Sequence, residues 1–291
     1  MTDATTLRPG DAIAAADWHA AFTAAFADYL IGPFQLALAQ WPGFLARQGV
    51  DLGLSRGAVG PDGTLRAFAL VAPRPEIGRW RLATMGAVPA ARGSGAAAAL
   101  LDDLVARATA AGLDTLELEA FTANERALRL YRGRGFEVVQ ALVGHERAAD
   151  TPPRPSTPST SVGPAAIAEP TLAEAWAWLA DAERRIADLP LQVTGRALAS
   201  SPVPLQAWRL GGAQLVFGAG PAERSITLHS LVDPQPAQAD AEALVAALCA
   251  RWPGHAQRVP PLQRDDLGGR ALARLGFAPA PLHQWLMRRP L

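Results

Sequence analysis

A glycine-rich stretch between an apolar run and a helical pattern has the clearest capacity for chemistry in this sequence. A loop in that place presents unpaired backbone N–H groups at the positive end of a helix dipole, which suits a pyrophosphate. Glycines at 93 and 95 would let the backbone approach an anion closely, and Arg92 could add a charge-assisted hydrogen bond. The residues expected to form this cradle are Val88, Arg92, Gly93, Ser94, Gly95, Ala96 and Ala97.

The loop alone leaves its role open. The glycines could serve only to make a tight turn between a strand and a helix, because a glycine signature of this length is weak by itself. A dinucleotide-binding site is another alternative, but its GxGxxG pattern needs a third glycine that is missing here.

Polar residues further along the chain could supply acid–base chemistry. Asn124 and Tyr131 are seven residues apart (131 − 124), which places them on the same face of a helix. Tyr131 could donate a proton or simply pack, and Asn124 could bind a ligand or cap the helix. Glu117 and Glu119 alternate with leucines on a predicted strand; a water chain could end at Glu119, although an exposed strand face explains both glutamates more simply.

Two motifs in this region resemble the GNAT superfamily of acyl-CoA-dependent N-acetyltransferases. The family's cofactor loop has the pattern Arg/Gln-x-x-Gly-x-Gly/Ala, which Arg92, Gly95 and Ala97 match in order. Its second signature, Asn-x-x-Ala-x-x-x-Tyr-x-x-x-Gly-Phe, is matched at the same spacing by Asn124, Ala127, Tyr131, Gly135 and Phe136. The resemblance is strongest from Trp80 to Phe136 and holds only in outline for the C-terminal half.

The resemblance implies an acetyltransferase that uses acetyl-CoA and acts on a primary amine of a small molecule or peptide. It implies that Tyr131 is the general acid and that Asn124 binds the pantetheine or an ordered water. The strand ending near Val88 would offer N–H groups to the thioester oxygen. The sequence departs from the family pattern at the general base. The stretch RLATMGAV contains no acidic residue, so the candidate base is Glu119, acting through a water chain. The alternative function is a non-catalytic acyl-CoA-binding or sensing module.

The order of expected elements predicts a mixed α/β sheet. Helical periodicity marks Asp11 to Leu30, Gly95 to Ala111 and Asn124 to Arg134, and a turn at Pro61-Asp62-Gly63 predicts a hairpin. The expected strands are Thr5 to Arg8, Leu54 to Val59, Thr64 to Val71, Trp80 to Val88, Leu113 to Ala120 and Phe136 to Val143.

The C-terminal half is expected to be a degenerate copy of the same fold. Aligning Val232 with Val88 replaces the key loop residues by Pro236, Ala237, Ala239 and Ala241, and a shifted register places Leu272 at the position of Tyr131. We therefore predict two tandem GNAT-like domains, at residues 1–147 and 171–291. They would be joined by a Pro/Ser/Thr-rich linker at 148–170.

The amino-acid composition excludes several kinds of partner, metal site and reaction. Acidic and basic residues balance at 27 each, which argues against nucleic acid or an anionic membrane as partner, and the chain is expected to be cytoplasmic and a monomer or homodimer. The single cysteine, Cys249, and the scattered histidines predict no metal site. The absence of lysine excludes Walker-type phosphate binding and Schiff-base chemistry.

Overall fold

The computed structural model describes residues 5–30, 32–151, 167–219 and 224–291. The chain divides into two compact units, a first unit of Met1–Val138 with Met287–Leu291 and a second unit of Val139–Leu286. Each is described by itself. Most of the predicted linker lies at 152–166, outside the described residues, and the predicted domain ranges remain a prediction.

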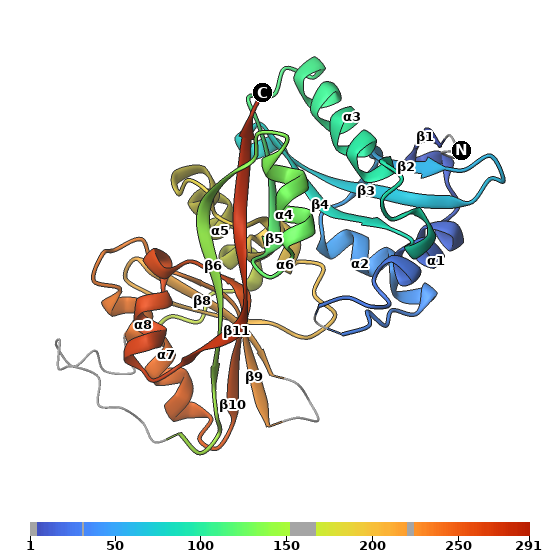
Figure 1. Cartoon of the computed structure of the whole chain (residues 1–291). Helices are drawn as coiled ribbons and strands as arrows, with labels where there is room; N and C mark the ends of the chain where they lie inside the picture. Colours follow the sequence, from blue (N-terminus) through green and yellow to red (C-terminus); the bar gives the residue numbers. More distant parts are fainter. Residues whose placement is uncertain (1–4, 31, 152–166, 220–223) are drawn as a thin grey trace. The chain divides into compact units, whose positions relative to one another are not determined.

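The first unit is a mixed α/β structure in which a β-meander is followed by a parallel strand. Its strand order is β1-β2-β3-β4-β5-β11, and only the end of β11 belongs to it. α3 covers one face of the strands, and α1 and α2 cover the other (Figure 1). The elements are β1 (Thr6–Pro9), α1 (Ala15–Ala25), α2 (Trp41–Arg47), β2 (Asp51–Val59), β3 (Leu65–Arg74), β4 (Arg79–Ala87), α3 (Ala96–Ala110), β5 (Thr115–Phe121), α4 (Glu125–Arg132) and β11 (Ala278–Pro290).

Helix α3 forms as its periodicity predicts. Leu100, Leu101 and Leu104 are fully buried on one face, whereas Asp102 is exposed, so the helix buries an apolar stripe against the sheet. The opposite layer is aromatic: Trp18, Phe22, Trp41 and Phe44 pack with Phe68 of β3. The sequence reading missed α2, and it made the helix before it too long, because α1 ends at Ala25.

Strand β4 carries a bulge and then separates from β5. Across β3, Leu70 pairs with Thr84 and Val71 with Leu82, so Ala83 is left without a partner in the ladder. β4 and β5 are parallel, and the last registered pair of the described strands joins Leu82 to Leu118. Both strands continue, β4 to Ala87 and β5 to Phe121. We call this divergence the splay; it leaves backbone N–H and C=O groups of β4 facing a gap between strands.

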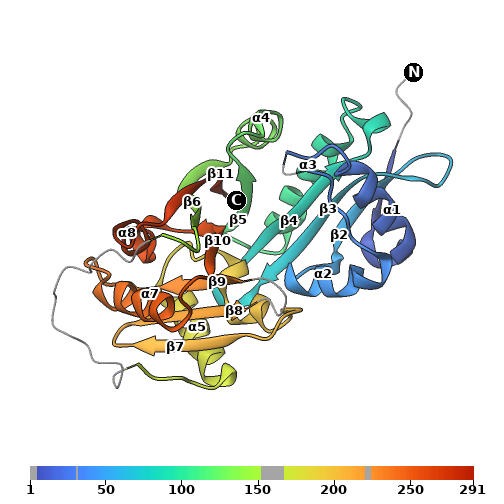
Figure 2. The ribbon, with the colours of Figure 1, turned by 90° about the horizontal axis from the view of Figure 1, so that it is seen from below.

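The second unit has the strand order β11-β6-β10-β9-β8-β7. Its antiparallel strands β7, β8 and β9 lie side by side (Figure 2). The elements are β6 (Glu137–Arg147), α5 (Leu172–Arg185), α6 (Gly195–Leu198), β7 (Gln206–Leu210), β8 (Ala213–Ala219), β9 (Ser225–Val232), α7 (Ala239–Arg251), β10 (Ala256–Gln263) and α8 (Gly269–Arg274).

Strands β9 and β10 behave like β4 and β5. His229 is the unpaired residue of a bulge in β9, since Ser230 pairs with Val216 and Leu228 with Phe217. β9 and β10 are parallel, and their last registered pair joins Thr227 to Arg258 although both strands run on. The second unit thus also has a bulge next to a splay.

Within the described part of the chain, no helix has the length and apolar character that spanning a membrane requires.

Candidate functional site

The loop that joins β4 to α3, which we call the cofactor loop (Val88–Ala97), curls through two left-handed glycines. Gly93 has φ +85° and Gly95, the N-cap of α3, has φ +88°. L-residues rarely adopt this conformation, so glycine is required at both positions. A Cβ added at either would meet nothing within 4 Å, which means that the requirement comes from the backbone and not from crowding within the chain.

The cofactor loop and the first turn of α3 present a group of unpaired amides. The N–H groups of Gly93, Gly95, Ala97 and Ala98 have no hydrogen-bond partner in the described part of the chain. The first turn of α3 contains no acidic residue. Orphan N–H groups at a helix N-terminus bind anions, and these amides fit the pyrophosphate that coenzyme A carries.

Arg92 does not extend alone from the loop. Its Nη1 donates to Asp28 Oδ2 and its Nη2 donates to Asp28 Oδ1, both at 2.6 Å, and Nη2 also donates to Ala25 O at 3.1 Å. Arg92 therefore links the cofactor loop to the C-terminal end of α1. Its expected contact with a pyrophosphate stays a prediction.

Tyr131 lies in the last turn of α4 and is 7% exposed. Burial raises the pKa of its phenol well above the ordinary value, and the nearby Tyr29 adds to the shift. The only two tyrosines of the chain thus lie within electrostatic range of each other. A phenol in this environment keeps its proton across the neutral range and can donate it to developing negative charge.

Asn124 has the capping role that was one of its two predicted alternatives. Its Oδ1 accepts the N–H of Ala127 at 3.2 Å, which leaves the side-chain NH₂ as the donor. Burial raises the pKa of the Tyr29 phenol, and the nearby Asn124 side chain partly offsets this rise. Asn124 therefore caps α4 and also lies within interaction range of the Tyr29 phenol.

Tyr29 lies near Asn124 and Tyr131, although neither motif assigns it to the site. Its ring lies 6.0 Å from that of Phe121, at the end of β5, and 4.8 Å from that of Phe26. It therefore lies on the β5 side of the splay. The signal that could have found it was its position one residue beyond Asp28, at the end of an apolar helix.

Glu119 is not on an exposed strand face, and that expectation is wrong for both glutamates. Glu117 is 1% exposed and bonds to Arg74 and Arg79, while Arg81 Nη2 lies 2.6 Å from Glu119 Oε2 with both side chains 2% exposed. Oppositely charged residues on β3 and β4 neutralise the two glutamates of β5. The Glu119 carboxylate is therefore engaged by a buried guanidinium, and its role as the base stays a prediction.

The corresponding loop of the second unit is filled by its own side chains. Asp233 is fully buried, and its carboxylate accepts the N–H groups of Gln235 and Ala241, the latter in the first turn of α7. The N-cap of α7 is Gln238, with φ +51°, and its side chain bonds to Asp265 O and Ala271 N. A carboxylate thus already occupies the helix terminus of this unit.

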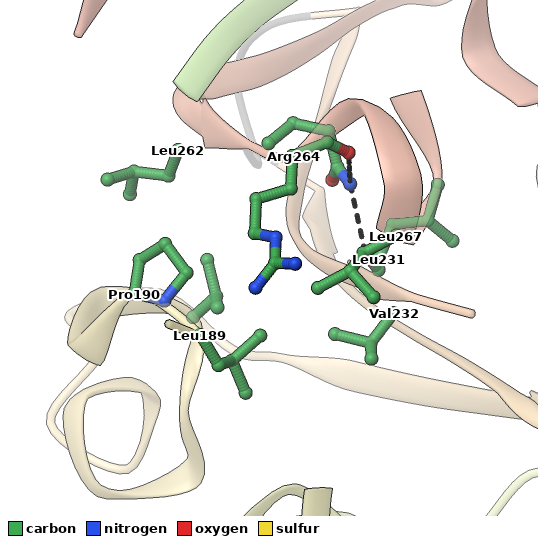
Figure 3. Close-up of a pocket in the computed structure, with 9 residues that line it drawn as sticks. Leu189, Pro190, Leu231, Val232, Leu262, Arg264 and Leu267 are labelled. Atoms are coloured by element: carbon green, nitrogen blue, oxygen red, sulfur yellow. Dashed lines mark hydrogen bonds between the residues drawn. The ribbon is translucent and has the colours of Figure 1, made fainter. Parts of the chain in front are cut away.

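The splay of the second unit is filled as well. Gln263 Nε2 donates to Leu231 O at 3.2 Å, across the gap between β10 and β9. Figure 3 shows this bond among the side chains around the gap, with Arg264 extending into the middle of the group. The space that remains there is on the order of one water molecule.

The site of the first unit lies in a part of the chain that matches a known protein family. Residues 17–136 match the model of the acetyltransferase (GNAT) family. This span contains the cofactor loop, the splay, Asn124 and Tyr131, and its similarity to the family agrees with the superfamily that the two motifs indicated. A comparison of the sequence with curated proteins finds no match.

Solved N-acetyltransferase structures share the fold over nearly the whole chain. A GCN5-related N-acetyltransferase from Sphaerobacter thermophilus has a TM-score of 0.63 and 17% identity, covering 99% of this chain and 96% of that one. A second, from Kribbella flavida, has a TM-score of 0.63 and 16% identity, covering 99% and 72%. Eis1 from Mycobacterium abscessus has a TM-score of 0.60 and 19% identity, covering 98% and 74%. At such identities the likeness concerns the fold.

Proposed function

We propose that the first unit transfers an acetyl group from acetyl-CoA to a primary amine. The observation that carries the proposal is the conjunction, within one unit, of unpaired amides on the cofactor loop, the splay between β4 and β5, and a buried, protonated Tyr131. The amides bind the pyrophosphate, and the free edge of β4 beyond Leu82 receives the pantetheine and the thioester. When bound, acetyl-CoA supplies the activated acyl group.

Tyr131 acts as the general acid for the departing thiolate. Its raised pKa does not disqualify it, because the burial that disfavours a phenolate also disfavours a thiolate in the same surroundings. The proton transfer is governed by the difference between the two pKa values, not by the phenol alone. The amine loses its proton to water, and Glu119, which is paired with Arg81, is the candidate end of a water chain.

The proposal is tested by thiol release from acetyl-CoA in the presence of a panel of primary amines, with an amine-free reaction as control. We expect release that depends on at least one amine and on Tyr131. Release that is the same with and without every amine would contradict acyl transfer.

The alternative function is a non-catalytic acyl-CoA-binding module. It predicts tight cofactor binding without amine-dependent thiol release. The buried phenol of Tyr131 favours catalysis, because binding alone has no need of a proton donor.

We further propose that the second unit is a degenerate copy of the first. The bulge, the splay and the left-handed N-cap recur in the same order, with His229 for Ala83 and Gln238 for Gly95. On this proposal Gln238, rather than Ala239, lies opposite Gly95. With Asp233 at the helix terminus, this unit takes up no acyl-CoA.

A further inference from the structure

The ion pair between Asp28 and Arg92 occupies guanidinium donors at the cofactor loop. A guanidinium has five N–H donors, and three of those of Arg92 are used by Asp28 and Ala25. The contact with Asp28 is the two-point fork that arginine also forms with phosphate. Asp28 and a phosphate group would therefore compete for the same N–H donors of Arg92.

The position of Arg92 makes the competition direct. It immediately precedes Gly93, and the unpaired amides of Gly93 and Gly95 are the donors that fit a pyrophosphate. An anion held at these amides lies beside the backbone that carries the guanidinium. The Asp28 carboxylate is anionic at neutral pH, because the hydrogen bond from Arg92 lowers its pKa.

The pair can exchange at low cost. The side chain of Arg92 is 29% exposed and that of Asp28 is 62% exposed, so water can replace either partner. Exposed ion pairs contribute little to stability, whereas breaking a buried one such as Arg81–Glu119 is costly. The ion pair at the cofactor loop, Arg92–Asp28, is thus easily exchanged, whereas the buried pair at the splay, Arg81–Glu119, is not.

We propose that Asp28 is an internal competitor that occupies Arg92 until the pyrophosphate of acyl-CoA takes its place, an inference that rests on the proposed function. Cofactor binding then releases the link between the cofactor loop and the end of α1. Tyr29 follows Asp28 directly and lies against Phe121, so the released segment is the one on the β5 side of the splay. Asp28 is a positioning residue that lowers affinity for the cofactor.

The experiment measures the dissociation constant of coenzyme A for the full chain by calorimetry, with Asp28→Asn, Arg92→Gln and the double variant. Asp28→Asn frees Arg92 and should tighten binding by up to about fivefold, the equivalent of an exposed ion pair. Arg92→Gln should weaken binding. In the Arg92→Gln background, Asp28→Asn should change the constant by less than about twofold.

Asp102→Asn is the matched control. Asp102 is also 62% exposed and forms a two-point pair with Arg134, which is 24% exposed, away from the cofactor loop. We expect this variant to leave the constant unchanged. Asp28 and Asp102 are both exposed, so their variants should fold. Thermal unfolding of each variant checks this.

Each outcome has one meaning. Unchanged or weaker binding by Asp28→Asn, with the parent binding normally, would overturn the competition and leave the proposed function standing. Equal tightening in both backgrounds would show simple charge repulsion and would overturn the exchange through Arg92. Failure of the parent chain to bind coenzyme A would overturn the proposed function and this inference with it.

Discussion

Leu82 and Leu118 form the last registered pair between β4 and β5, and the chain continues on both sides of this point without a further pair among the described residues. The divergence begins beside Ala83, the unpaired residue of the bulge. A bulge bends its strand and increases its twist, so the geometry of β4 itself turns the strand away from β5. The cofactor loop begins where this opened strand ends.

Gly95→Ala tests the cofactor loop. At φ +88° an alanine costs roughly 1–2 kcal/mol, and this strain acts on the loop that carries the unpaired amides, so both stability and coenzyme A affinity should fall. Gly63→Ala is the control, since Gly63 has φ +82° in the β2–β3 turn with nothing within 4 Å. It should lose similar stability while binding coenzyme A normally. Equal loss of affinity in both variants would point to stability alone.

Tyr131→Phe tests the proposed acid. We expect turnover to fall by about 10²- to 10⁴-fold with coenzyme A affinity nearly unchanged, because the ring and its contact with Phe136 are retained. Since burial raises the pKa of Tyr131 above its usual value, the phenol stays protonated as pH rises to 10. The pH–rate profile of the parent should therefore show no loss from this group below pH 10. Turnover equal to that of the parent would remove Tyr131 from the mechanism.

Substitutions of Asn124 separate its two contacts. Asn124→Ala removes the cap of α4 and should lower the free energy of unfolding by about 0.5–2 kcal/mol. Asn124→Ser keeps a capping oxygen but is too short to reach Tyr29, so its stability should stay near that of the parent. If the interaction with Tyr29 matters for the site, both variants should lose activity to a similar extent. Activity that instead follows stability would leave Asn124 as a cap only.

The buried pair at the splay should be costly to break. Arg81→Ala leaves the Glu119 carboxylate buried, and we expect a loss of about 3–5 kcal/mol in denaturant unfolding. Glu125→Ala, at a pair whose side chains are 71% and 82% exposed, should change stability by no more than about 1 kcal/mol. Similar small losses in both variants would mean that Arg81 and Glu119 do not act as a buried pair.

Local patterns predicted the elements of the first unit well. The apolar spacing of α3 and the glycines that flank it set its bounds to within one residue, Ala96–Ala110 against Gly95 to Ala111. The start of α4 was also predicted to within one residue, and its end to within two, Glu125–Arg132 against Asn124 to Arg134. These features depend on residues a few positions apart, which a sequence shows directly.

Contacts between residues far apart in the sequence could not be predicted from local sequence patterns. Alternation on β5 indicated one solvated face, but Arg81 comes from a neighbouring strand 38 positions away and buries Glu119. The alternation of Arg79 and Arg81 with apolar residues on the preceding strand was the available signal. Likewise, nothing near Arg92 in sequence indicates that Asp28, 64 positions earlier, takes its guanidinium.

The most direct test of the central claim is an NMR titration of the full, ¹⁵N-labelled chain with coenzyme A. The account predicts saturable shifts of the amide signals of Gly93, Gly95 and Ala97, while the signal of Ala241, whose N–H is bound by Asp233, stays in place. Shifts centred on Ala241, or no shift at the cofactor loop when coenzyme A is in excess, would contradict it.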